Sequence, residues 1–279
     1  MSGLNIACGT VLFRKYPLEK ALETIRSIGF EWVETQAVGP WCPHVTINET
    51  DPIKYADLVK KIGFKGTTAI WMPNGTIISN EKSVESAKLT LEWAHAAGIP
   101  VVNTGDGYKS KEMSDEEAFK NYEDRMLRIL ETCEKTLTYI ALEPHGTFSL
   151  TCAGLERLVS FTESPWLGIN YDACNIRRAY YIENGAEGSK LVQASMMENE
   201  CDVLKRVVKK VVHTHAKDMK DGKCVALTEG IVDTKGWLAI LKQAGYNGAI
   251  SLETEGEEDF DTTVSIAKKG LSFLHSISW

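Results

Sequence analysis

The sequence predicts a single-domain α/β protein in which residues 1–279 form one (β/α)8 TIM barrel. Three observations support this prediction: helical and β-rich segments alternate, eight β-rich runs can be counted, and no Gly/Ser-rich or Pro-rich linker separates them. Alternating segments form parallel sheets with helical crossovers, and a chain of 279 residues is an ordinary length for one barrel. No GxGxxG motif follows the first run, so the signature of a dinucleotide-binding sheet is missing.

The repeating unit is an amphipathic helix, a glycine and a short β-rich run. Gly29, Gly63, Gly98 and Gly245 follow four of the helical patterns, where glycine readily takes the left-handed conformation that ends a helix. The expected strands, in chain order, are Asn5–Thr10, Trp32–Gln36, Gly66–Trp71, Val101–Thr104, Tyr139–Glu143, Leu167–Asp172, Val211–His215 and Ala249–Glu253. A last amphipathic helix, Thr262–His275, is expected to close the barrel.

Three long irregular segments are expected on the face of the barrel where the strands end. They follow the second, sixth and seventh strands, as Ala37–Asp51, Cys174–Ser189 and Met219–Val232. Loops at this end of a parallel barrel build and cover the active site.

The composition is that of an ordinary globular protein, with 43% hydrophobic and 25% charged residues. A net charge of −7 argues against a nucleic-acid partner, which would require a basic face. No apolar run reaches the ~18–20 residues of a membrane span, and MSGLNIACGT does not resemble a secretory signal. Seven cysteines without a CxxC spacing indicate reduced thiols. Together these features predict a cytoplasmic protein with no membrane partner.

Four consecutive strands are expected to finish on a side chain that can bind a metal. These residues are Glu143 in LEPHG, Asp172 in NYDACN, His215 in VVHTHAKD and Glu253 in SLETE. Strand ends 5 to 8 of a parallel barrel converge on one face, where three carboxylates and an imidazole would need a cation between them. One nitrogen and three carboxylate ligands suit an ion of intermediate hardness, with Mn²⁺ as the first choice and Co²⁺, Mg²⁺ or Zn²⁺ as alternatives.

The order of these four motifs resembles the xylose isomerase-like barrel superfamily, the sugar phosphate isomerase/epimerase group. That group includes tagatose and psicose 3-epimerases, inosose dehydratases and hydroxypyruvate isomerases. The resemblance spans the whole chain and implies that Glu143, Asp172, His215 and Glu253 bind one divalent metal ion, with Glu143 and Glu253 also acting as acid and base. Asn175 and Asp221 stand where the ketose 3-epimerases usually have a substrate-binding histidine and an arginine, which disfavours a plain free-ketose 3-epimerase.

The chemistry also follows from the residues. A metal that chelates a carbonyl and the neighbouring hydroxyl stabilises the enediolate formed when the adjacent carbon loses its proton. Glu143 and Glu253 could remove and return that proton, which gives an epimerase or isomerase. His145, two residues beyond Glu143, could protonate a leaving group; loss of a β-substituent would make the protein a lyase, either inosose dehydratase-like or a lyase of 3-keto O- or C-glycosides.

Four further residues are candidates for substrate binding. Trp71 could pack against a sugar face, Asn175 occupies the position of the substrate histidine, and Lys217 could hold a substrate oxygen with Asp218 as its ion-pair partner. The expected partner is a small sugar or cyclitol, with a homo-oligomer or a partner subunit left open. Two other classes remain as alternatives: a metal-dependent DNA-repair endonuclease, disfavoured by six histidines and an acidic chain, and a barrel that serves as a subunit without turnover.

Overall fold

The protein folds as a closed barrel of eight parallel strands, as the sequence predicts. The computed structural model describes residues 4–177 and 198–279. The strands pair in the order β1-β10-β7-β6-β5-β4-β3-β2, and β1 closes the barrel between β2 and β10. They are β1 (Asn5–Gly9), β2 (Trp32–Gln36), β3 (Gly66–Trp71), β4 (Val101–Thr104), β5 (Tyr139–Leu142), β6 (Leu167–Asp172), β7 (Val211–Ala216) and β10 (Ala249–Leu252). The bounds of β2, β3, β4 and β6 are as predicted, and the other four strands differ by one residue at their carboxyl ends.

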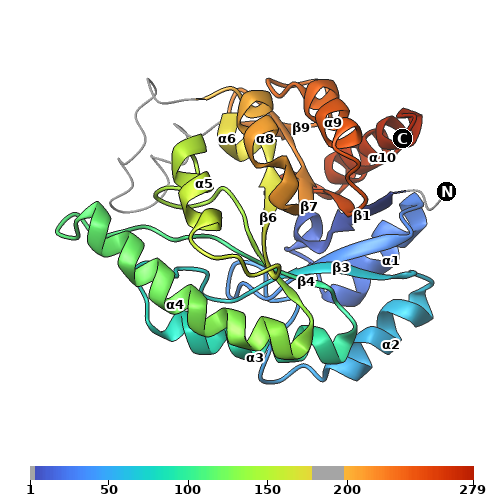
Figure 1. Cartoon of the computed structure of the whole chain (residues 1–279). Helices are drawn as coiled ribbons and strands as arrows, with labels where there is room; N and C mark the ends of the chain where they lie inside the picture. The colour runs from blue at the N-terminus through green and yellow to red at the C-terminus, as the bar shows by residue number, and fades with distance from the viewer. Residues whose placement is uncertain (1–3, 178–197) are drawn as a thin grey trace.

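Helices surround the barrel (Figure 1). They are η1 (Thr10–Phe13), α1 (Leu18–Ile28), α2 (Pro52–Ile62), α3 (Lys82–Ala97), α4 (Asp115–Thr136), α5 (Cys152–Ser160), α6 (Ala173–Arg177), α8 (Glu200–Val207), η3 (Val208–Lys210), α9 (Thr234–Gln243) and α10 (Phe260–Ser276). The glycines at 29, 63, 98 and 245 all have positive φ, as predicted. Helix α10 begins two residues earlier than predicted because the Asp259 side chain caps it by accepting from the Thr262 amide.

The apolar core lies mainly between the strands and this outer layer of helices. It includes Leu22 and Ile25 of α1, Leu91 of α3 and Trp237 of α9, none of them more than 1% exposed. Helices α3 and α4 pack side by side, and α10 packs against β1 and β10 where the barrel closes (Figure 1). None of the helices in the described part of the chain has both the length and the apolarity that a membrane span requires.

Two of the expected irregular segments contain secondary structure. The expected segment Met219–Val232 begins inside a two-stranded antiparallel hairpin, β8 (Asp218–Lys220) and β9 (Lys223–Val225), which turns through Asp221 and Gly222 with positive φ. This hairpin was missed because its strands are three residues long and carry lysines in place of an apolar alternation. The start of Cys174–Ser189 belongs to α6, and its residues 178–189 lie outside the described residues.

Candidate metal centre

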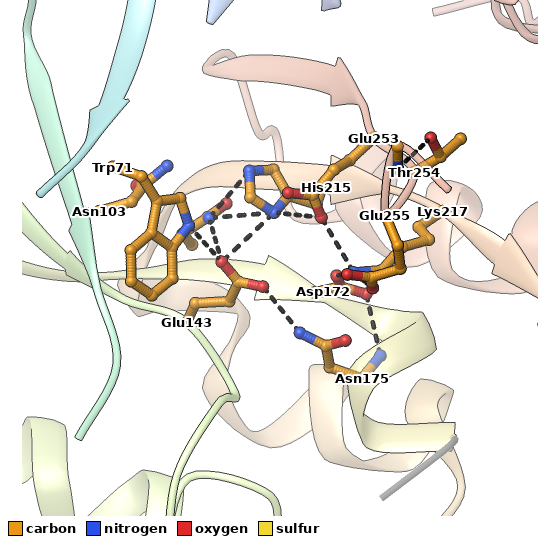
Figure 2. Close-up of polar contacts among 12 residues, drawn as sticks. Trp71, Asn103, Glu143, Asp172, Asn175, His215, Lys217, Glu253, Thr254 and Glu255 are labelled. Carbon is orange, nitrogen blue, oxygen red and sulfur yellow. Dashed lines mark hydrogen bonds and ion pairs between the residues drawn. The ribbon is translucent and has the colours of Figure 1, made fainter. Parts of the chain in front are cut away.

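The four side chains expected to bind a metal meet at the carboxyl ends of β5, β6, β7 and β10 (Figure 2). Glu143, Asp172, His215 and Glu253 each offer one ligand atom, and these atoms all lie within 4.8 Å of one another. The four residues are between 0% and 7% exposed. Glu143 and Glu253 directly follow the last residues of β5 and β10, so the parallel register of the strands places them on either side of His215. Its Nδ1 lies 3.4 Å from Glu143 Oε2 and 3.2 Å from Glu253 Oε2.

The carboxylates at this centre are held in two different ways. Glu143 accepts hydrogen bonds from neutral donors, from Trp71 Nε1 at 2.7 Å and from Asn175 Nδ2 at 2.7 Å. Glu253 instead accepts from the Lys217 ammonium, whose Nζ lies 2.9 Å from Glu253 Oε2. Glu143 is therefore oriented by dipoles, whereas Glu253 is compensated by a full charge.

Lys217 has partners other than the one that the sequence suggested. Its Nζ lies 2.9 Å from Asp172 Oδ2, 2.9 Å from Glu253 Oε2 and 3.2 Å from Glu255 Oε1, and the residue is 3% exposed. The expected ion pair with Asp218 is wrong. Asp218 Oδ1 accepts from the amides of Met219 and Val232, and Oδ2 accepts from Gly230, because the chain turns into the β8–β9 hairpin directly after Lys217. Asp218 therefore anchors the loop that follows β7.

A cavity of about 350 Å³ opens over the centre. Its lining consists of Gln36, Val38, Trp41, Trp71, Glu143, His145, Lys217, Glu253 and Glu255. Besides Glu143 and Glu253, the cavity contains Trp71, Lys217 and His145 from the predicted set. His145 is exposed, and its ring lies 6.0 Å from that of Trp71. Asn175, by contrast, is fully buried against Glu143 and Asp172. Its backbone N–H donates to Asp172 Oδ1 at 2.9 Å.

Sequence reasoning missed Gln36, Trp41 and Glu255 in this lining. Glu255 could have been found. It lies two residues beyond Glu253 in SLETEG, and two residues apart in an extended chain place their side chains on the same face. Trp41 lies in the loop after β2. Neither the alternation of a strand nor the periodicity of a helix predicts where a side chain in such a loop will lie.

A second cluster, also missed, lies inside the barrel below the centre. Glu34 of β2 and His213 of β7 meet His215 there, with one ligand atom of each within 4.8 Å of the others. Glu34 is 1% exposed, and both of its oxygens face His215 Nε2, at 2.9 and 3.0 Å. The sequence did contain a signal for this cluster, namely a glutamate in the middle of a predicted barrel strand. Such a side chain points either into the barrel or into the apolar layer of helices, and a charged group buried in either place needs a partner.

Electrostatics show that this region favours positive charge. Burial alone would lower the pKa of the His215 imidazole, but Glu253, Glu34 and Glu143 around the ring raise it well above its usual value. Burial would raise the pKa of Glu253, yet His215 and Lys217 lower it. His213 faces fewer compensating charges, and burial lowers its pKa to about 4, so this ring is neutral at pH 7.

The residues fit a divalent metal ion. Asp172 Oδ2 is fully buried and receives no hydrogen bond from the described residues, although the Lys217 ammonium lies nearby, so a lone pair remains to be satisfied. Three carboxylates and one imidazole, without a thiolate, are the donors that Mn²⁺, Co²⁺, Mg²⁺ or Zn²⁺ accept. Glu143, Asp172, His215 and Glu253 would hold such an ion at the floor of the cavity.

The closed barrel and its buried carboxylate–histidine group define a (β/α)8 barrel with a metal-competent centre at the carboxyl ends of its strands. The chain belongs to the xylose isomerase-like TIM barrel family, whose model matches residues 22–277. No curated protein sequence matches the chain.

Several solved structures share the fold. A D-tagatose 3-epimerase-like protein is 21% identical, with a TM-score of 0.73 and 98% of each chain covered. The IolI protein with a bound zinc atom is 16% identical, with a TM-score of 0.73 and coverage of 97% of this chain and 96% of that one. A probable 3-DHS dehydratase from Bacillus anthracis is 19% identical, with a TM-score of 0.72 and coverage of 99% and 100%.

Proposed function

We propose that this protein is a divalent-metal-dependent isomerase or epimerase that removes a proton next to the carbonyl of a sugar, keto-sugar or cyclitol. The observation that carries the proposal is the convergence of Glu143, Asp172, His215 and Glu253 at the floor of a cavity. The zinc in IolI and the sugar named for the 3-epimerase-like protein support the same class of chemistry.

In this mechanism Glu143 and Glu253, the two carboxylates that belong to the metal centre and also line the cavity, transfer the protons. A bound ion would act as a Lewis acid that polarises the substrate carbonyl and stabilises the enediolate. Glu143 and Glu253 lie on two sides of His215, so one can accept the α-proton while the other delivers a proton from the opposite direction. Return to the opposite face of the same carbon is epimerisation, and return to the neighbouring carbon is isomerisation.

The neighbours of these two carboxylates keep them in place during proton transfer. Trp71 and Asn175 each donate to a different oxygen of Glu143, which fixes the plane of that carboxylate. Lys217 stabilises the ionised form of Glu253, so that this side chain is ready to accept a proton. We also propose that Trp71 presents its ring to the sugar and that Lys217 contacts a substrate oxygen, because both line the cavity.

The test combines metal analysis with isotope exchange. The purified chain is stripped with EDTA, titrated with Mn²⁺, Co²⁺, Zn²⁺ or Mg²⁺, and then incubated in D₂O with a panel of ketoses, inososes and 3-keto glycosides while NMR follows exchange at the α-carbon. We expect one ion per chain and ion-dependent exchange that Glu143→Gln and Glu253→Gln each reduce by at least about 10²-fold. Glu31→Gln, an exposed residue paired with Lys65, is the matched control. A chain that binds no ion, or that exchanges equally well in EDTA, would contradict the proposal.

A lyase is the second candidate, and the position of His145 favours it. This imidazole is exposed in the cavity beside Trp71, and its backbone amide is fixed by Ser149 Oγ at 2.9 Å. It could therefore protonate a leaving group after Glu143 or Glu253 has removed the α-proton, and the similarity in fold to a probable 3-DHS dehydratase supports this candidate. Loss of water or aglycone in the same NMR experiment, reduced in His145→Gln while α-exchange persists, would establish the lyase; exchange without elimination across the panel would exclude it.

A further inference from the structure

The Glu34 cluster inside the barrel lies directly below the metal centre and has no part in the proposed proton transfer. Glu34 belongs to β2, which β1 and β10 separate from β7, the strand that carries His215. Glu34 lies in a regular stretch of β2, paired with Gly9 of β1. Here the side chain crosses the barrel and reaches His215 Nε2 with both oxygens.

The two ring nitrogens of His215 therefore have different surroundings. Nε2 faces the carboxylate of Glu34, at 2.9 and 3.0 Å, whereas Nδ1 faces Glu143 and Glu253 at the metal centre. The amide nitrogen of Asn170 lies 3.2 Å from Nε2 and 3.4 Å from Nδ1. Because it is almost equally distant from both nitrogens, it lies along neither lone pair and does not select between them.

The same cluster could be read as a second metal site, but the contacts of His213 argue against this. His213 Nδ1 lies 3.0 Å from Asn170 Oδ1, and its Nε2 lies 3.2 Å from Thr68 Oγ1. Both ring nitrogens thus have hydrogen-bond partners and offer no lone pair to an ion. Asn103 Nδ2 donates to Glu34 Oε1 at 2.9 Å, so Glu34 is also held by a protein donor.

We propose that Glu34 is a positioning residue: it accepts the Nε2 proton of His215 and thereby presents the unprotonated Nδ1 to the ion. A neutral imidazole carries one proton, so the nitrogen that donates to a carboxylate leaves the other free to bind a metal. This inference rests on the proposed function, since it concerns the ion held by Glu143, Asp172, His215 and Glu253. It gives β2, which supplies none of those four ligands, a part in building the centre.

Asn103 makes the inference testable with a nearly isosteric substitution. In Glu34→Gln, keeping the hydrogen bond from Asn103 Nδ2 requires the new amide oxygen at the position of Oε1, and the new NH₂ group then faces His215 Nε2. A donor at that position moves the imidazole proton to Nδ1, where it blocks the ligand atom. Carboxylates that orient a metal-binding histidine typically contribute about 10–100-fold to affinity, and we expect Glu34→Gln to weaken Mn²⁺ binding by that factor.

The experiment measures the tautomer and the affinity separately. ¹⁵N NMR of histidine side chains in protein loaded with diamagnetic Zn²⁺ should show His215 protonated at Nε2 and metal-bound at Nδ1 in the unsubstituted chain, and a smaller fraction of this form in Glu34→Gln at the same Zn²⁺ concentration. Calorimetric titration with Mn²⁺ gives the affinities, with Glu31→Gln as the control for loss of one carboxylate. Circular dichroism and thermal unfolding verify that each variant is folded.

The outcomes separate this inference from the proposed function. If the unsubstituted chain binds no Mn²⁺, the proposed function fails; if it binds Mn²⁺ and Glu34→Gln binds equally well, or if the Zn²⁺-loaded unsubstituted chain carries the His215 proton on Nδ1, only the role of Glu34 is overturned. A double variant, Glu34→Gln with Asn103→Leu, frees the new amide to rotate and should recover part of the affinity. Continued weak binding in the double variant would mean that Glu34 acts through its charge alone, which would overturn the tautomer argument. Two Mn²⁺ ions per chain would overturn it in favour of a second metal site.

Discussion

At the scale of single residues, Lys217 places its ammonium among three carboxylates. It lies 2.9 Å from Asp172, 2.9 Å from Glu253 and 3.2 Å from Glu255, and is 3% exposed. Lys217→Met keeps the length of the side chain and removes the charge, so the carboxylates lose compensation in a buried setting. Breaking a buried ion pair costs about 3 kcal/mol or more. We expect a loss of about this size in the free energy of unfolding in EDTA, measured by urea denaturation.

Mn²⁺ should reduce this loss, because the ion supplies positive charge to Asp172 and Glu253. The exposed pair of Lys65 with Glu31 provides the control: Lys65→Met should cost less than about 1 kcal/mol with or without the ion. Equal stability of Lys217→Met and the unsubstituted chain in EDTA would show that the carboxylates need no compensating charge.

The residues at the strand ends were predictable because their positions depend on strand parity and parallel order alone. Glu143, Asp172, His215 and Glu253 need only the correct strands to be brought together. Glu34 was not identified, since its contact with His215 joins β2 to β7 through the barrel interior, and these strands are not neighbours in the sheet. Lys217 was assigned the wrong partner because the chain leaves the strand immediately after it, so strand parity no longer applies to Asp218.

At the scale of elements, Asp218 joins the end of β7 to the β8–β9 hairpin and the loop that leads to α9. Its carboxylate accepts from three backbone amides, at 2.9, 2.9 and 3.1 Å, and is 1% exposed. Asp218→Ala would leave these donors unsatisfied, and we expect it to lower the free energy of unfolding by about 3 kcal/mol. Hydrogen exchange should accelerate across residues 219–232, with a smaller effect on Mn²⁺ affinity than that of Glu34→Gln. A large loss of affinity with unchanged exchange in this segment would instead indicate a direct role at the centre.

The loop between β2 and α2 contains a histidine that links its stability to pH. His44 Nε2 donates to the Tyr16 carbonyl at 3.0 Å, and its Nδ1 lies 3.4 Å from Cys42 Sγ, a weak donor. Burial lowers the pKa of His44, so below about pH 6.5 the unfolded chain takes up a proton at this residue more readily than the folded protein does. Its contribution to stability is therefore present above that pH and is lost as the pH falls.

His44→Gln should remove this pH-dependent contribution. The amide can still donate to the Tyr16 carbonyl, so the fold is retained, and the difference in unfolding free energy between pH 7 and pH 5 should be smaller than in the unsubstituted chain. Urea denaturation at the two pH values provides the measurement, and His95→Gln on the exposed face of α3 is the control. If the difference in unfolding free energy between pH 7 and pH 5 is the same in His44→Gln as in the unsubstituted chain, His44 does not link stability to pH.

The barrel strands were predictable to within a residue, because each is a β-rich run in the alternation with helices, and a glycine after the preceding helix marks four of them. The hairpin β8–β9 and the short helix η1 were not predictable in this way. Each has at most four residues, too few to show a periodicity, and their conformations depend on contacts with the rest of the chain, such as the acceptor that Asp218 supplies.

At the scale of the whole molecule, the metal centre joins four of the eight barrel strands. Its ligands come from β5, β6, β7 and β10, and β10 pairs with β1, which closes the barrel onto β2. Glu34 extends these contacts across the interior from β2 to β7. An ion at the centre would therefore stabilise the closed barrel as a unit, and we propose that the chain unfolds as a single domain.

Thermal unfolding should consequently show one transition that shifts with metal concentration. A ligand at a hundred times its Kd stabilises the folded state by about 2.7 kcal/mol, which for a chain of this size raises the Tm by roughly 5 °C. Calorimetry of EDTA-treated protein with increasing Mn²⁺ provides the measurement, and excess EDTA should reverse the shift. Glu143→Gln, which removes a ligand charge but keeps an acceptor for Trp71, should respond weakly, whereas Glu31→Gln should respond fully. Two transitions, only one of which moves with Mn²⁺, would show that the strands carrying the centre unfold separately from the rest of the barrel.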